Sequence, residues 1–220
     1  MRSLTRRLAV AACAALALSA CGQKGGSAAA GGVGGAAPAG AFKDAEYVIG
    51  DPKAPVTVIE YLSDTCSHCA RFDREVFPTI KKDYIDPGKV SWHIREFLTD
   101  PVQVSAAGFA LARCAGKDKY WSVVEAIFRA QDEMFRTGDF LTPFKRIAAG
   151  VGMSPAQFDA CVRNDQVLQG IADRVQRATD VDKITGTPTI IVDGDRHVNE
   201  MDLPQTRAAL DKALAAKGKS

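Results

Sequence analysis

Two cysteines separated by two residues follow a short apolar run, and this arrangement narrows the folds open to the chain. The run Val56 to Leu62 is β-branched and apolar, as expected of a central strand. It leads into Cys66-Ser67-His68-Cys69, and a helical pattern continues from Ala70 to Tyr84, where Pro78 should introduce a kink. The sequence therefore predicts a strand, a turn and a helix, with Cys66 in the first turn of the helix.

The rest of the chain adds further strands and a long helical block. A second strand is predicted from Val90 to Phe97, and a third from Thr189 to Val192 should pair, across a turn, with about Arg196 to Asn199. Residues 101–183 contain no convincing strand pattern. Breaks between helices are expected in this block at Thr137-Gly138, Gly150-Val151-Gly152 and Ser154-Pro155.

This order of elements predicts an α/β fold. Parallel strands need a crossover and hairpins do not, so we expect a mixed sheet of four or five strands flanked by helices. Residues 46–100 and 184–220 would form the two halves of the fold, and 101–183 an inserted all-helical subdomain. A capping box near Asp202 should start the last helix. Aromatic side chains of the helical block are expected to lie in its core: Tyr120, Trp121, Phe128 and Phe135.

The first 45 residues have the composition of a processing segment and a spacer. Residues 1–20 combine three arginines with an apolar run shorter than the roughly 20 residues of a membrane-spanning helix, which is typical of a secretory signal. Small residues directly before Cys21 resemble the lipobox of bacterial lipoproteins, so Cys21 is the expected lipidation site. The alternative is ordinary cleavage after Ala20. Residues 21–45 are rich in Gly and Ala and are expected to form a flexible tether.

The charge balance argues against nucleic acid as a partner. The chain has 28 Lys+Arg and 26 Asp+Glu, and removing Arg2, Arg6 and Arg7 with the leader leaves 25 against 26. A protein that binds by neutralising phosphates would carry a clear basic excess. With 46% hydrophobic and 25% charged residues, the composition is that of a globular protein able to bury a core.

The cysteine pair has the arrangement of a reactive dithiol. Unpaired N–H groups and the helix dipole stabilise a thiolate at a helix N-terminus, which would make Cys66 nucleophilic. Spacing i, i+3 places Cys69 on the same face and one turn deeper. His68 can supply positive charge or a hydrogen bond, and would lower the pKa of Cys66 further. A stabilised dithiol form makes the corresponding disulfide a strong oxidant.

The same spacing is also half of a zinc site, which needs four ligands. Cys114 and Cys161 are far apart in sequence, and His93 and His197 fall on predicted strands, so no metal site is predicted. Copper handling, or a structural disulfide without turnover, would also be compatible with this spacing. No cofactor is implied.

The sequence resembles the DsbA-like branch of the thioredoxin superfamily over about residues 46–215. The resemblance rests on Gly50-Asp51-Pro52 through Cys69, on Arg95-Glu96-Phe97 and on Gly186-Thr187-Pro188-Thr189. It implies a thioredoxin fold, a cis Pro188 beside the active-site cysteines, and a Thr187 that helps to bind the substrate backbone. Glu60 matches the buried acid that assists proton transfer at Cys69. The chain departs from the family at Ser67, where Pro is more common.

The remaining two cysteines, Cys114 and Cys161, are expected to form a structural disulfide, as is usual in an exported protein. The alternative is a pair of buried free thiols. On the chain-entropy model, closing the loop between these cysteines is worth roughly 4 kcal/mol.

Together these features predict a monomeric, membrane-tethered periplasmic oxidoreductase that introduces disulfides into exported proteins with free cysteines. A quinone-linked membrane protein is the candidate reoxidant, and the membrane that holds the lipid, inner or outer, is left open. A reductase or isomerase of the same fold is the competing interpretation within this chemistry, and a non-redox lipoprotein binding module that handles metal is the competing interpretation outside it.

Overall fold

The computed structural model describes residues 41–198 and 202–218. The predicted signal peptide, the lipidation site Cys21 and most of the predicted tether lie outside the described residues. None of the helices described is long and apolar enough to cross a membrane.

The described strands form one mixed five-stranded sheet in the order β1-β3-β2-β4-β5. Their bounds are Tyr47–Ile49 for β1, Val56–Leu62 for β2, Val90–Glu96 for β3, Thr189–Val192 for β4 and Asp195–Val198 for β5. Strands β2 and β3 are parallel, and the other pairs are antiparallel. The predicted mixed sheet is therefore confirmed, with the short edge strand β1 as an addition that its three residues were too few to signal.

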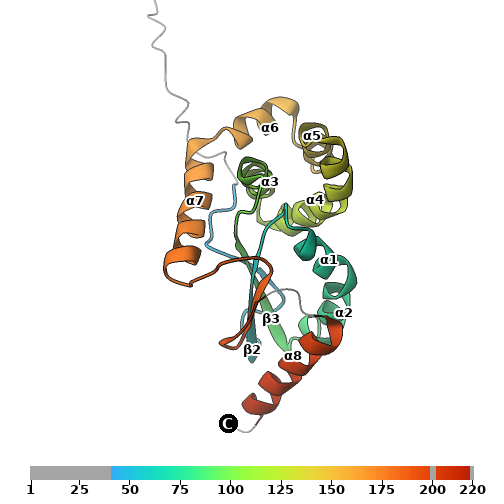
Figure 1. The fold of residues 1–220 in the computed structure, drawn as a ribbon, viewed down its shortest axis with the longest axis vertical. Coiled ribbons are helices and arrows are strands. Elements are labelled where there is room, and N and C mark those ends of the chain that lie inside the picture. Colours follow the sequence, from blue (N-terminus) through green and yellow to red (C-terminus); the bar gives the residue numbers. More distant parts are fainter. Residues whose placement is uncertain (1–40, 199–201, 219–220) are drawn as a thin grey trace, which may run out of the picture. The chain divides into compact units, whose positions relative to one another are not determined.

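One side of the sheet is covered by helices that come from both halves of the predicted α/β fold (Figure 1). Helices α1 (Ser67–Glu75), α2 (Phe77–Ile80) and α8 (Leu203–Lys217) lie on one side of the strands, and the π-helical turn η1 (Lys81–Ile85) follows α2. Pro78 lies in the first turn of α2, so the chain breaks at Val76 and starts a new helix instead of bending one helix. On this face Trp92 of β3 packs between Phe72 and Phe77, with ring centroids 6.0 and 5.5 Å away.

The helical insertion follows β3 and returns the chain to β4. Its helices are α3 (Val102–Cys114), α4 (Lys117–Thr137), α5 (Leu141–Gly150), α6 (Pro155–Val162) and α7 (Asp165–Asp180). The α4–α5 and α5–α6 breaks lie where they were predicted: Gly138 ends α4 in the left-handed conformation, and Ser154 with Gln157 forms a capping box at the start of α6. The α3–α4 break at Ala115-Gly116 and the α6–α7 break at Arg163-Asn164 were not predicted. Asp202 with Gln205 caps α8 in the same way, as predicted.

A disulfide and a buried ion cluster fix this insertion. Cys114 at the end of α3 is bonded to Cys161 of α6, with a Cα–Cα distance of 6.2 Å, which confirms the predicted pair. Glu96, at the end of β3, accepts hydrogen bonds from Arg113 of α3 at 2.6 Å and from Arg174 of α7 at 2.9 Å. Since Glu96 and Arg113 are almost fully buried, loss of Glu96 would leave the charge of Arg113 in the core without its ion-pair partner.

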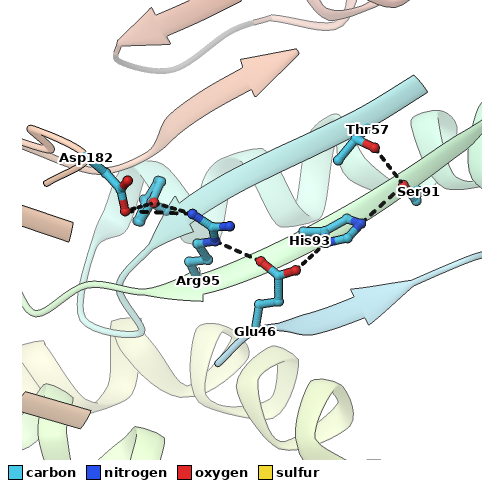
Figure 2. A network of polar contacts seen from close by, with 7 residues as sticks. Glu46, Thr57, Ser91, His93, Arg95 and Asp182 are labelled. Atoms are coloured by element: carbon cyan, nitrogen blue, oxygen red, sulfur yellow. Dashed lines mark hydrogen bonds and ion pairs between the residues drawn. The ribbon is translucent and has the colours of Figure 1, made fainter. Parts of the chain in front are cut away.

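On the α7 side of the sheet, a chain of polar contacts joins the segment before β1 to the loop after α7 (Figure 2). Glu46 lies between His93 and Arg95, at 2.7 and 2.8 Å, and Arg95 reaches Asp182 through the hydroxyl of Tyr61. His93 therefore has a structural partner in Glu46.

Candidate active site

Cys66 is the N-cap residue of α1, at the end of β2 where the two central parallel strands end. Its backbone is extended, and its Sγ accepts a hydrogen bond from the N–H of Cys69 at 3.4 Å. The sulfur thus occupies the position of a capping oxygen, where the unpaired N–H groups of the first turn favour negative charge. Cys66 is half-buried, Cys69 is buried, and both are thiols.

These contacts lower the pKa of Cys66 from its ordinary 9.0 to about 5. The largest cause is a hydrogen bond from the Cys69 thiol, and burial opposes it. Further contributions come from the Thr187 side chain and from the backbone N–H groups of Cys69 and His68. At neutral pH the chemistry of Cys66 is therefore that of a thiolate.

The second cysteine has the opposite character. Burial is the main reason that the pKa of Cys69 lies well above its ordinary range, and the negative charges of Cys66 and Glu60 add to it. The two sulfurs are thus strongly separated in acidity: Cys66 is the half-buried thiolate and Cys69 the buried thiol.

Glu60 of β2 is the buried acid beneath this pair. Its side chain accepts a hydrogen bond from Trp92 Nε1 at 2.7 Å. Burial raises the pKa of Glu60 to about 8, the Trp92 hydrogen bond opposes the shift, and the charges of Asp73 and Cys66 add to it. Glu60 is therefore mostly protonated at pH 7, so it has a proton to give to a group beside it.

The Thr187–Pro188 peptide bond is cis, as the resemblance implied, and it lies beside Cys66. In its thiol form, Cys66 donates from Sγ to the carbonyl oxygen of Thr187 at 3.3 Å. The hydroxyl of Thr187 is buried and has no hydrogen-bond partner among the described residues, so it is available to donate to a Cys66 thiolate. The bond between Asp100 and Pro101 is also cis, which the sequence did not indicate.

One expectation about side chains stays a prediction, and another needs correction. The imidazole of His68 is exposed, and His68 favours the Cys66 thiolate through its backbone N–H, while the effect of its imidazole stays a prediction. Phe135, expected in the core, is 46% exposed, although its ring packs edge-on against Phe140. Tyr120 and Phe128 are buried as predicted, and Trp121 is half-buried.

Several residues around the site were not found from the sequence. Gln131 of α4 donates from Nε2 to the carbonyl oxygens of Asp64 and Cys66, at 2.7 and 3.2 Å. Asp73, one helical turn after Cys69, is buried with its Oδ1 unpartnered within the described part of the chain, and burial raises its pKa to about 7. The sequence did contain a signal for Asp73, because this residue lies four positions after Cys69 and therefore on the same face of the predicted helix. No sequence signal pointed to Gln131, because it lies in the helical insertion, far along the chain from the cysteine pair.

The further ligands that a zinc site at the cysteine pair would require are engaged elsewhere. Cys114 and Cys161 are bonded to each other, and His93 contacts Glu46 and Ser91. Across residues 41–198 and 202–218, no three His, Cys, Asp or Glu side chains are grouped so that they could hold a metal ion.

A mixed sheet with a dithiol at a helix N-terminus, next to a cis-proline loop, defines the thioredoxin class of proteins. The sequence model of the family described as thioredoxin matches residues 43–212, and the chain therefore belongs to the thioredoxin family.

Within this family, the chain is similar to proteins named for disulfide chemistry. A Rickettsia typhi protein, named as a candidate protein-disulfide oxidoreductase, is 30% identical over 80% of this chain and 64% of its own length. Disulfide bond formation protein D of Bacillus subtilis is 26% identical over 77% of this chain and 78% of its own length. The crystal structure of Wolbachia pipientis alpha-DsbA1 superposes with a TM-score of 0.72 at 29% identity, covering 78% of this chain and 92% of that chain.

These similarities place the chain in the DsbA-like branch of the superfamily. The chain spans only 61% to 64% of the length of two rickettsial relatives.

Proposed function

We propose that this protein is a thiol–disulfide oxidoreductase that transfers its Cys66–Cys69 disulfide to exported proteins. The observation that carries the proposal is the separation in acidity of the two sulfurs, with the pKa of Cys66 lowered to about 5 and that of Cys69 raised. A purely structural disulfide needs no such difference. The names of the relatives, which refer to disulfide formation, support the same reaction class.

The reaction proceeds by two exchanges. A substrate thiolate attacks Sγ of Cys66, the Cys66–Cys69 bond breaks, and Cys69 leaves as a thiolate that takes up a proton. Glu60, with a pKa of about 8, is the buried group that can deliver this proton. A second substrate thiolate then attacks the substrate sulfur of the mixed disulfide, and Cys66 leaves as a thiolate. The substrate has lost two electrons and the protein has gained them.

The acidity of Cys66 sets the direction of this exchange. A thiol with a low pKa is a good leaving group, and stabilising its thiolate stabilises the reduced protein. The disulfide is then readily given away. Reoxidation requires an external oxidant, for which a quinone-linked membrane protein is the proposed partner.

The sequence of the leader supports a proposal for where in the cell the protein acts. We propose a periplasmic protein held to a bacterial membrane through lipidated Cys21, with the Gly/Ala-rich segment 21–45 as its tether. In cell fractionation, the wild type should sediment with membranes, and Cys21→Ser should release the protein to the soluble fraction. Equal behaviour of both would contradict lipid attachment.

The experiment that tests the function is the capture of substrates as mixed disulfides in cells. Cys69→Ala removes the thiol that resolves a mixed disulfide from within the protein, and Pro188→Ala opens the loop beside Cys66. Together they should accumulate Cys66-linked partners that appear on non-reducing gels. The double variant Cys66→Ala/Cys69→Ala is the matched control and should trap nothing. If no partner accumulates in the trapping variant, disulfide donation to proteins is the wrong function.

A further inference from the structure

The turn that delivers the chain from β2 to Cys66 contains a fully buried carboxyl group with no role in the exchange described above. Asp64 is 0% exposed and lies two residues before Cys66. One carboxyl oxygen, Oδ1, accepts a hydrogen bond from Ser105 Oγ of α3 at 2.7 Å. The other, Oδ2, is buried and has no hydrogen-bond partner among the described residues. A buried oxygen without a partner is costly, so its retention calls for a reason.

Gly108 of α3 provides the space for this carboxyl group. A Cβ atom at Gly108 would lie 1.9 Å from Asp64 Oδ2 and 3.0 Å from Asp64 Cγ, and real Cβ atoms do not approach so closely. Gly108 has ordinary helical backbone within Val102–Cys114, where alanine would be the better helix former. The close approach of Asp64 therefore accounts for glycine at this position. Ser105 and Gly108 are three residues apart, so they share one face of α3.

The same turn is held by further buried hydrogen bonds from the insertion. Ser63 Oγ lies 2.9 Å from Ser105 Oγ and 3.2 Å from the backbone N of Thr99. Gln131 of α4 binds the carbonyl oxygen of Asp64 at 2.7 Å. Finally, Cys66 N donates to the carbonyl oxygen of Ser63 at 3.1 Å, which closes the turn. Side chains from two helices of the insertion, Ser105 of α3 and Gln131 of α4, thus hold Ser63 and Asp64 in the turn before Cys66.

We propose that Asp64 is a positioning residue for Cys66: its carboxyl group, inserted against Gly108 and held by Ser105, fixes the turn that places the Cys66 sulfur at the N-terminus of α1. The sulfur lies 3.4 Å from the backbone nitrogen of Cys69, whose N–H donates to it. Interactions between a charge and hydrogen-bond donors weaken as the distance grows. A turn released from α3 would therefore weaken the stabilisation of the thiolate. The inference deepens the proposed function, since it concerns the same cysteine.

The surroundings of Asp64 disfavour the charged form of its carboxyl group. Burial is the main reason that its pKa lies well above the ordinary range, the nearby Glu96 adds to the shift, and the hydrogen bond from Ser105 opposes it. A charged carboxylate this close to Cys66 would oppose the thiolate. Asparagine, which has the same shape and no charge, is therefore the conservative replacement.

Two single variants and one control test the assignment on the full reduced protein. Thiolate absorbance near 240 nm, followed against pH, gives the pKa of Cys66. Asp64→Ala should raise this pKa by about one unit or more, a tenfold loss of acidity, whereas Asp64→Asn should stay within about half a unit of the wild type. Gly150→Ala is the matched control, because a Cβ atom at this helical glycine meets no atom within 4 Å. It should leave the pKa unchanged.

A double variant separates positioning from general stability. Gly108→Ala alone should lower the melting temperature strongly, since its methyl group collides with the carboxyl group. In Asp64→Ala/Gly108→Ala the new methyl group occupies the vacated space, so the melting temperature should recover while the pKa of Cys66 remains raised. A double variant with the Cys66 pKa of the wild type would overturn the positioning role.

The outcome also distinguishes this inference from the proposed function. An ordinary Cys66 pKa in the wild type would contradict the proposed function and this inference with it. An acidic Cys66 in the wild type, with equally acidic Cys66 in Asp64→Ala and in the double variant, would contradict only the positioning role.

Discussion

At the scale of single residues, the site contains one acidic sulfur, that of Cys66, and several groups whose charged forms are disfavoured by burial. Cys66 is charged near pH 7, whereas Cys69, Glu60 and Asp64 have pKa values raised chiefly by burial. Burial penalises charge on the buried groups, and hydrogen bonds at the helix N-terminus compensate it only at Cys66. Within the site, the negative charge therefore lies on the sulfur of Cys66, which is the sulfur that a substrate can reach.

Glu60 should be tested with Glu60→Gln, which keeps the shape of the side chain but removes the proton that can be delivered to Cys69. We expect slower exchange of the oxidised protein with a dithiol substrate near pH 7, because Cys69 then leaves without a nearby acid. The rate profile of the wild type should change near pH 8, the pKa of Glu60, and this step should be missing in the variant. Stopped-flow rates from about pH 5 to 9 measure it. An unchanged profile would show that Glu60 takes no part in the proton transfer.

His68 offers a second test at this scale. Because the Cys66 thiolate is favoured by the backbone N–H of His68, and alanine retains this group, His68→Ala should shift the pKa of Cys66 by less than about one unit. Titration of thiolate absorbance measures the shift. A rise of about two units or more would assign the effect to the imidazole, which is the role that the sequence pattern alone indicates.

How much of the site could be predicted depends on how local its contacts are. Cys66 and Cys69 lie in one turn–helix segment, where spacing along the chain determines which side chains meet, whereas Glu60 and Pro188 were placed by the resemblance. Ser105 and Gln131 lie 41 and 67 residues from Asp64, their partner in the turn. A helical pattern does not show which serine or glutamine of a helix will face a distant turn.

At the scale of elements, the Cys114–Cys161 disulfide ties α3 to α6 and should act on stability alone. Its sequence separation of 47 residues corresponds to roughly 4 kcal/mol of unfolding free energy on the chain-entropy model. Cys114→Ala/Cys161→Ala should therefore lower the urea midpoint clearly. The pKa of Cys66 should remain near that of the wild type, because neither cysteine touches the site. A lower midpoint with a shifted pKa would show that this disulfide also tunes the reaction.

The helix boundaries were well predicted where capping residues mark them, and poorly where packing decides. Ser154 and Asp202 mark the starts of α6 and α8 through their own hydrogen bonds to the first turn. Pro78 marks the break that follows α1, as the sequence indicated. The π-helical turn at Lys81–Ile85 follows from packing against the sheet and α8, which no local pattern encodes. For the same reason the three-residue strand β1 was not predicted.

At the scale of the whole molecule, the acidity of Cys66 should couple the redox state to stability. The pKa of Cys66 is lowered on folding, from about 9.0 to about 5, so its contribution is present above pH 9 and is lost as pH falls through 5. The unfolding free energy of the reduced protein, minus that of the oxidised protein, should therefore rise between pH 5 and 9, by at most about 1.4 kcal/mol per unit. Asp73 has a raised pKa and the opposite trend, but both redox forms contain it. The part of the Glu60 shift that comes from the Cys66 charge, and the raised pKa of Cys69, occur only in the reduced form and make the rise smaller, that of Cys69 mainly toward pH 9.

Urea unfolding of both forms at several pH values measures this difference. The oxidised protein is its own control, since its Cys66 does not titrate. A difference that stays constant across this pH range would mean that folding does not make Cys66 acidic.

The measurement that tests the central claim most directly is the equilibrium of the Cys66–Cys69 pair with glutathione, quantified by alkylation and mass analysis. The account predicts an oxidising pair, with a potential above about −200 mV and toward the value of about −120 mV known for the strongest oxidant of this class, while Cys114–Cys161 stays bonded. A potential near about −270 mV, as in thioredoxin, would mean that the pair is a reductant and would contradict the proposed donation of disulfides.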